Sequence, residues 1–134
     1  IVFSPMAQGV LTGKYSPDRQ PPKGSRATDD KGGAKFIAKF MTPEILSAVQ
    51  DLAPIAKEAG LTMAQLALAW VLQNPNVAAT IVGASRPKQL NDTVKASGIK
   101  LDADTVEAVN SALHNVSVTD PNKTYEVPPK RRPC

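Results

Sequence analysis

The sequence has very few residues that crosslink a chain or bind a metal. Of its 134 residues, only Cys134, the last, is a cysteine, and only His114 is a histidine. A disulfide within the chain is therefore excluded, and a structural zinc cluster has no set of ligands. A single thiol fits a reducing compartment, so we expect a cytoplasmic location and no metal site.

Long apolar runs and aromatic clusters are also scarce. The longest apolar stretch, residues 61–72, is interrupted by Thr62 and Gln65 and is too short for a membrane span. No signal-peptide pattern opens the chain. The net charge of +4 is scattered, apart from Lys130-Arg131-Arg132, and no aromatic residue is interleaved with that run to stack on bases. We therefore expect neither a membrane span nor a nucleic-acid partner.

What remains is ordinary globular composition, 42% hydrophobic and 21% charged, arranged as alternating strand-like and helix-like segments. Apolar and β-branched runs predict two buried parallel strands, at residues 1–4 and 77–82. Between them, residues 16–33 are rich in proline and glycine and predict a loop. The pattern dissolves after His114, so the C-terminal end is expected to be a tail.

Helical spacing and capping residues predict four helices. Thr42 followed by Pro43 opens the first, which Pro54 should kink or restart. Thr62 and Gln65 form a capping box for the second, which is apolar nearly all round and should be well buried. The third begins near Pro87 and the fourth after Asp102. Leu90 and Val94 mark the apolar stripe of the third helix, and Val106, Val109 and Leu113 are expected to face inward in the fourth.

Strands that alternate with helices indicate an α/β fold with a parallel sheet. Two strands cannot close a barrel, and they cannot make an open sheet with both faces covered. The chain also lacks an initiator methionine. We therefore expect this segment to be part of a larger domain.

The loop after the second strand carries groups that suit a phosphate. A helix N-terminus offers free backbone N–H groups, and Gly83 lets a ligand approach the backbone closely. Ser85 adds a hydroxyl, and Arg86 adds a guanidinium fork. Gln89 and Asp92 follow on the same side of the helix. The same residues also fit an ordinary strand-to-helix turn with Ser85 as its cap.

The loop after the first strand is the second candidate, because loops at the carboxyl ends of parallel strands form the sites of such folds. Phe3 fits either the core or a ring face offered to a planar ligand. Lys14 and Arg26 fit either a phosphate clamp or solvated positions. No catalytic set is visible, since His114 lies at a helix end and Ser4 has no histidine near it in the sequence.

Three segments in chain order resemble the aldo-keto reductase family. They are SPMAQGVLTGKY at 4–15 with GSRA at 24–27, AQLALAWVL at 64–72, and IVGASRPKQL at 81–90. The resemblance runs from Ile1 to about Leu113. It is closest to the bacterial branch that also includes the potassium-channel β subunits.

The resemblance implies an eight-stranded (β/α) barrel, with residues 1–114 as its C-terminal part, about the last two strands with their helices, and residues 115–134 as a tail. The N-terminal part of the same barrel would be the partner of this segment. The implied activity is reduction of an aldehyde or ketone to an alcohol by hydride transfer from NADPH. The family's catalytic Asp, Tyr, Lys and His come from earlier strands, so no catalytic residue is expected here.

The resemblance also assigns cofactor contacts. The aromatic at Phe3 stacks on the nicotinamide, the following turn leads to the diphosphate, and Lys14 and Arg26 match basic contacts of the loop. The second loop matches positions that hold the 2′-phosphate and adenine. Phe3 stands where Trp or Tyr is usual, and Asp92-Thr93 replace a common Glu-Asn pair. The full set is Phe3, Ser4, Pro5, Met6, Ala7, Gln8, Lys14, Arg26, Gly83, Ser85, Arg86, Gln89 and Asp92.

Two alternatives remain at this point. A protein similar to the channel β subunits would use the same barrel to sense the nicotinamide cofactor while it docks to a membrane protein. An inactive fragment is the other alternative.

Overall fold

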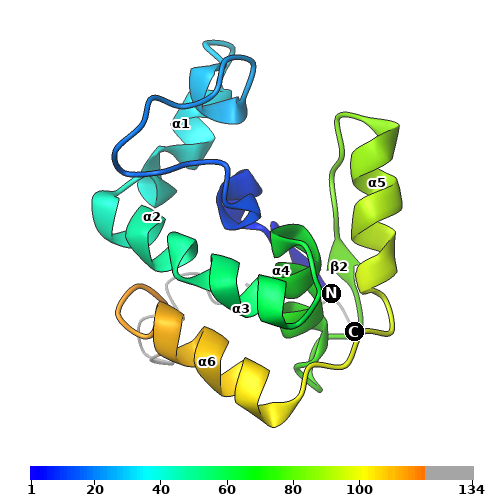
Figure 1. Cartoon of the computed structure of the whole chain (residues 1–134). Helices are drawn as coiled ribbons and strands as arrows, with labels where there is room; N and C mark the ends of the chain where they lie inside the picture. Colours follow the sequence, from blue (N-terminus) through cyan, green and yellow to red (C-terminus); the bar gives the residue numbers. More distant parts are fainter. Residues whose placement is uncertain (120–134) are drawn as a thin grey trace, which may run out of the picture.

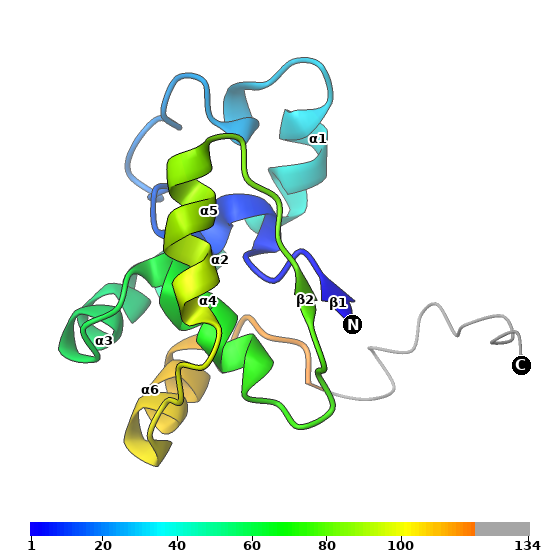
Figure 2. The same ribbon diagram turned by 90° about the vertical axis from the view of Figure 1, so that its right-hand side faces the viewer.

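A computed structural model describes residues 1–119 of the chain. Two short strands, β1 (Val2–Phe3) and β2 (Thr80–Ile81), pair in parallel. Val2 lies opposite Thr80, and Phe3 lies opposite Ile81. The helices gather on one side of this pair (Figures 1 and 2), and Figure 2 shows the pair at the edge of the molecule. The predicted parallel pairing is confirmed, although the strands are shorter than the residues 1–4 and 77–82 expected.

Helices make up most of the structure. Four α-helices and three 3₁₀ helices lie between the two strands, and two α-helices and one 3₁₀ helix follow β2 within the described residues. The α-helices are α1 (Gly33–Ile37), α2 (Pro43–Gln50), α3 (Leu52–Glu58), α4 (Met63–Leu72), α5 (Pro87–Thr93) and α6 (Ala103–Leu113). The 3₁₀ helices are η1 (Ala7–Thr12), η2 (Arg26–Thr28), η3 (Ala38–Phe40) and η4 (Val94–Ala96).

Three of the predicted helix starts are confirmed by their caps. The Thr42 side chain accepts a hydrogen bond from the Ile45 amide, with Pro43 at the first helical position. Thr62 and Gln65 form the reciprocal capping box of α4. The Asp102 carboxylate accepts from the Thr105 amide at 2.7 Å. Local side-chain chemistry alone therefore fixes where these helices begin.

The predicted interruption near Pro54 separates α2 from α3 at Asp51. Proline has no N–H, and its ring clashes with the carbonyl four residues earlier, here that of Gln50. The chain therefore restarts as a second helix with Pro54 in its first turn, where the missing N–H costs little.

The predicted loop at 16–33 is only partly a loop. Arg26–Thr28 form η2, and α1 begins at Gly33. The Asp29 carboxylate accepts from the Lys31 and Gly33 amides, which turns the backbone into α1. Sequence composition did not reveal this side-chain-to-backbone turn.

Two adjoining hydrophobic clusters hold the helices together. The first joins η1, α1 and α2, and the second joins α3, α4 and α6. Leu11 and Met63 pack against both clusters, so they connect the two. Residues 65–69 of α4 are all buried, as its apolar pattern predicted, and Val109 of α6 is buried too.

The apolar stripe of the third helix, Leu90 and Val94, is not buried by the other described residues. They are 53% and 62% exposed, whereas Thr93 and Ala96 are the buried residues of this segment. Phe3 and Ile81 are also exposed, at 81% and 62%. The strand pair and α5 thus present an uncovered apolar surface.

Within residues 1–119, no single helix is long and apolar enough to cross a membrane. One pair, α2–α3 with α4, passes the length and composition test together, but the two parts are bent by 90°.

Leu66→Ala should destabilise the protein at its full natural length by about 2–5 kcal/mol, because Leu66 is 1% exposed in the α4 cluster and its loss leaves a cavity. Urea denaturation followed by circular dichroism measures this. Ser47→Ala, at an exposed position of α2, is the control and should change little. Equal denaturation midpoints for the two variants would contradict the assigned core.

The stability of α6 should depend on pH through Asp102. Its hydrogen bond from the Thr105 backbone lowers the pKa of Asp102 below its usual 3.8. The stabilisation is therefore complete above the unfolded pKa and is lost as pH falls through the folded pKa. In Asp102→Asn, the melting temperature should therefore fall less on acidification than it does in the unsubstituted protein. An equal fall in the two proteins would refute this.

Candidate functional site

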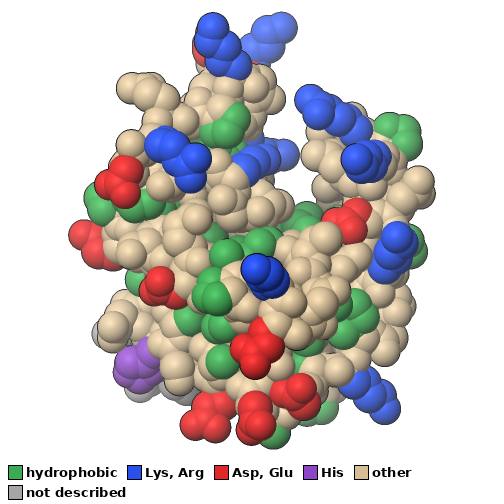
Figure 3. All heavy atoms as spheres, viewed as in Figure 1, with side chains coloured by type: hydrophobic (Ala, Val, Ile, Leu, Met, Phe, Trp, Pro, Cys, Tyr) green, Lys and Arg blue, Asp and Glu red, His purple; other side chains and the backbone are tan. Residues whose placement is uncertain are grey.

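The parallel pairing brings the two candidate loops to one edge of the sheet. β1 runs into the turn at Ser4 and η1, and β2 runs into the connection that leads to α5. Two parts of the chain lie at the same end of the molecule: the segment that contains η2 and α1, and the start of α5 (Figures 1 and 2). The space-filling view shows the surface hollowed between them, with Lys and Arg side chains on both sides (Figure 3).

The turn after β1 has a strained backbone. Ser4, Ala7 and Gln8 have φ values of 53°, 46° and 60°, and Gly9 follows at 96°. Only glycine adopts this left-handed region without penalty, and each other residue costs on the order of 1–3 kcal/mol. Such strain gathers at ligand-binding sites. The sequence carried only one signal of it, Gly9.

Three of the predicted residues meet in a hydrogen-bonded chain at this turn. The Gln8 amide nitrogen donates to the Ser4 hydroxyl, and Arg26 donates to the Gln8 amide oxygen. Arg26 comes from η2, 18 residues further along the sequence. The structure therefore ties the long loop back onto the strained turn.

Lys14 lies beside the same turn. A Cβ built on Gly9 would stand 3.3 Å from the Lys14 Nζ, so the ammonium lies against the Gly9 backbone. Gln50 on α2 holds the neighbouring chain, because its amide donates to the carbonyls of Gly13 and Tyr15 at 3.3 and 2.6 Å. Lys14 itself is exposed and available to an anion.

Phe3 lies at the end of β1, directly before this turn. With 81% of its surface exposed, its ring is not part of the core formed by the described residues. The ring is therefore free to contact a further part of the protein or a planar ligand. Pro5 of the turn is buried, and Met6 and Ala7 are half-buried.

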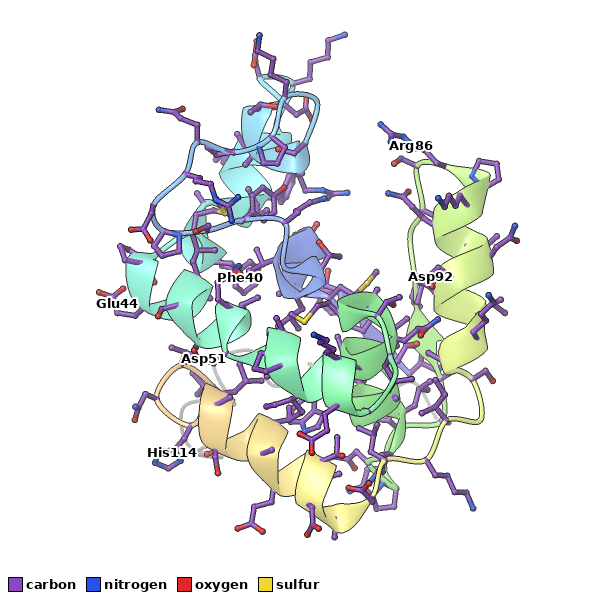
Figure 4. The ribbon with its side chains drawn as sticks, viewed as in Figure 1. Phe40, Glu44, Asp51, Arg86, Asp92 and His114 are labelled. Carbon is purple, nitrogen blue, oxygen red and sulfur yellow. The ribbon has the colours of Figure 1, made fainter. Side chains whose placement is uncertain are left out.

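In the second loop, Gln89 shapes the backbone that precedes α5. Its amide oxygen accepts from the Ser85 amide and hydroxyl and from the Arg86 amide, at 2.9, 3.0 and 3.0 Å. Arg86, not Ser85, occupies the N-cap position, which corrects the cap expected from the sequence. The Arg86 side chain projects outward at the end of the molecule near the hollow (Figure 4), and Gly83 is exposed in the same connection.

Asp92 lies apart from these groups. Its carboxylate accepts from the Thr62 hydroxyl at 3.0 Å and from the Gln65 amide at 2.9 Å, both at the start of α4. Its labelled side chain points from α5 toward α4 (Figure 4). The structure therefore joins Ser85, Arg86 and Gln89 but directs Asp92 elsewhere.

Charge is distributed unevenly over the described residues. The loop and helices of residues 14–39 carry seven lysines and arginines against three aspartates, and residues 86–95 carry three against one. Residues 40–85 and 96–119 have an excess of acidic residues. Positive charge thus gathers in the two segments that flank the hollow, which favours an anionic ligand.

Metal-binding and acid–base groups do not assemble in the same way. Among residues 1–119, no three His, Cys, Asp or Glu side chains gather as metal ligands would. His114 is exposed at the C-terminal end of α6 (Figure 4). Cys134 lies outside the described residues, as does most of the predicted tail.

Comparison with known proteins identifies this architecture. Residues 1–114 match the model of the aldo/keto reductase family. The chain belongs to that family, and the resemblance read from its three motifs is confirmed.

Its relatives include proteins of two kinds. It is 40% identical over 98 residues to a probable voltage-gated potassium channel subunit beta of Arabidopsis thaliana, covering 70% of this chain and 28% of the relative. It is 38% identical over 97 residues to L-glyceraldehyde 3-phosphate reductase of Escherichia coli O157:H7, covering 72% and 28%. The matched segment thus spans little more than a quarter of these relatives.

Gln8→Ala should free the η2 segment, because it removes the acceptor for Arg26 and the donor to Ser4. Amide hydrogen exchange at residues 26–28 should then accelerate, with most of the core unchanged. Gln20→Ala, at an exposed position of the same loop, is the matched control. If exchange at 26–28 is equal in the two variants, the Gln8 link does not hold the loop.

Proposed function

We propose that this chain supplies the cofactor-binding part of an NADPH-dependent aldo-keto reductase that reduces aldehydes or ketones to alcohols. Residues 1–114 would form the C-terminal part of a (β/α)8 barrel, and residues 115–134 a C-terminal tail. Family membership supports the fold, and a relative named as a reductase supports the chemistry. One observation carries the proposal. The polar and basic residues that the family resemblance assigns to the cofactor form two hydrogen-bonded groups, Ser4–Gln8–Arg26 and Ser85–Gln89, on the two loops that flank the hollow.

The residues present fit a nicotinamide dinucleotide. The exposed Phe3 ring would stack on the nicotinamide, and the Ser4–Gln8 turn with Lys14 and Arg26 would hold the diphosphate. Left-handed residues at the turn bring backbone close to a ligand, as a diphosphate requires. When bound, the cofactor supplies the hydride for the carbonyl carbon.

Selectivity for the 2′-phosphate would come from the second loop. Gln89 holds the Ser85 and Arg86 amides in one turn. The exposed Arg86 guanidinium matches phosphate oxygens in a fork geometry. A charge-assisted contact of this kind favours NADPH over NADH.

The uncovered apolar surface supports the remaining barrel as the partner. Ile81, Leu90 and Val94 are all more than half exposed, on β2, α5 and η4 respectively. Within the described residues, each strand pairs only with the other, so the outer edges of both stay free. Further strands of the same barrel would cover this surface and supply the catalytic Asp, Tyr, Lys and His of the family.

The test is nucleotide binding to the protein at its full natural length, measured by quenching of its fluorescence. NADPH should bind more tightly than NADH. Arg86→Ala should weaken the binding of NADPH by roughly 10- to 100-fold, the equivalent of about 1.5–3 kcal/mol. NADH affinity should change little.

Lys88→Ala is the matched control, since Lys88 is an equally exposed cation two residues away on α5. It should leave the preference for NADPH intact. Equal losses in the two variants would mean that Arg86 acts only through general positive charge, and no binding of either nucleotide would refute the proposed function.

The relatives named as channel subunits support a second candidate, a regulatory protein that senses the nicotinamide cofactor. Turnover distinguishes the two. Steady reduction of simple aldehydes by the full-length protein would favour the enzyme, whereas tight NADPH binding with negligible turnover would favour the sensor.

A further inference from the structure

Asp92 makes contacts that a direct cofactor ligand would not need. One carboxylate oxygen accepts from the Thr62 hydroxyl, and the other accepts from the Gln65 amide nitrogen. The Gln65 side-chain nitrogen also donates to the backbone carbonyl of Asp92 at 3.2 Å. Both oxygens are therefore engaged by α4.

Gln65 is committed to this arrangement. Its side chain is only 9% exposed, so an amide left unpaired here would be destabilising. Its oxygen accepts from the Thr62 backbone amide, while its nitrogen donates to Asp92. One side chain thus caps α4 and binds α5.

Among residues 1–119, this polar contact adds to a small apolar contact between the α5–η4 segment and the core. Leu90 and Val94 are exposed, and only Thr93 and Ala96 of this segment are buried. By contrast, α4 is anchored in the core by Leu66 and Leu68, each 1% exposed. The Asp92 contact therefore links α5 to a helix that is anchored in the core.

The same helix carries the phosphate-facing turn. Gln89, one helical turn before Asp92, holds the Ser85 and Arg86 amides. A continuous path of hydrogen bonds and helix backbone thus runs from α4 through Asp92 and α5 to Arg86. A shift of α5 on α4 would move the Arg86 guanidinium.

We propose that Asp92, with Gln65 and Thr62, is a positioning residue that fixes α5 on α4 and so sets the selectivity for a 2′-phosphorylated nucleotide. This inference rests on the proposed cofactor site. It assigns Asp92 a different role from the adenine contact that the family resemblance implies for this position.

The test is a double-mutant cycle with NADPH and NADH as probes, in the protein at its full natural length. Gln65→Ala and Asp92→Ala should each weaken NADPH binding by about 5- to 30-fold, while NADH affinity stays nearly constant. The double variant should bind NADPH no worse than either single variant, because both break the same link.

Two further variants separate positioning from general damage. Gln73→Ala removes a single hydrogen bond, to the Leu101 amide, at the far end of α4, and should leave both affinities unchanged. Asp92→Asn keeps an oxygen that accepts from Gln65 and should restore most of the preference for NADPH. If Gln65→Ala does not fold, the comparison of Asp92→Ala with Asp92→Asn gives the same answer.

The outcomes are distinct. Equal losses of NADPH and NADH in Asp92→Ala, with Gln65→Ala unchanged, would show that Asp92 contacts the adenine itself and would overturn the positioning role. If the unmodified protein binds neither nucleotide, the proposed function fails, and the positioning role fails with it. A selective loss of NADPH in both single variants would support the inference.

Discussion

The parallel pairing of β1 with β2 is the constraint on which the rest of the structure depends. Val2 and Phe3 come from one end of the chain, and Thr80 and Ile81 lie nearly 80 residues later. Because the strands run in the same direction, the turn at Ser4 and the connection to Arg86 leave the sheet at the same edge. The pairing is therefore what brings the two basic segments to the same hollow.

The buried helix α4 supports both loops. It contacts η1 on one side and α5 on the other, and it also contacts β2. Its capping box serves two purposes, since Gln65 completes the cap and also binds Asp92. The helix that secures the core therefore also sets where the two candidate binding segments lie. Under the proposed function, the phosphates of a nicotinamide cofactor would bind at these segments.

Residue patterns in the sequence predicted what depends on short-range chemistry. The caps at Thr42, Thr62 and Asp102 and the break before Pro54 follow from local hydrogen bonding and from the missing proline N–H. The grouping of Ser4, Gln8 and Arg26 was implied by the family resemblance, yet their hydrogen bonds were not.

Long-range contacts could not be read in this way. The outward turn of Leu90 and Val94 and the pairing of Asp92 with α4 depend on how α5 settles against another helix. The most direct measurement is a crystal structure of the full-length protein with NADPH. The account predicts the 2′-phosphate within hydrogen-bonding distance of Arg86, with Asp92 still bonded to Gln65. A nucleotide bound away from both loops, or Asp92 turned onto the adenine, would contradict it.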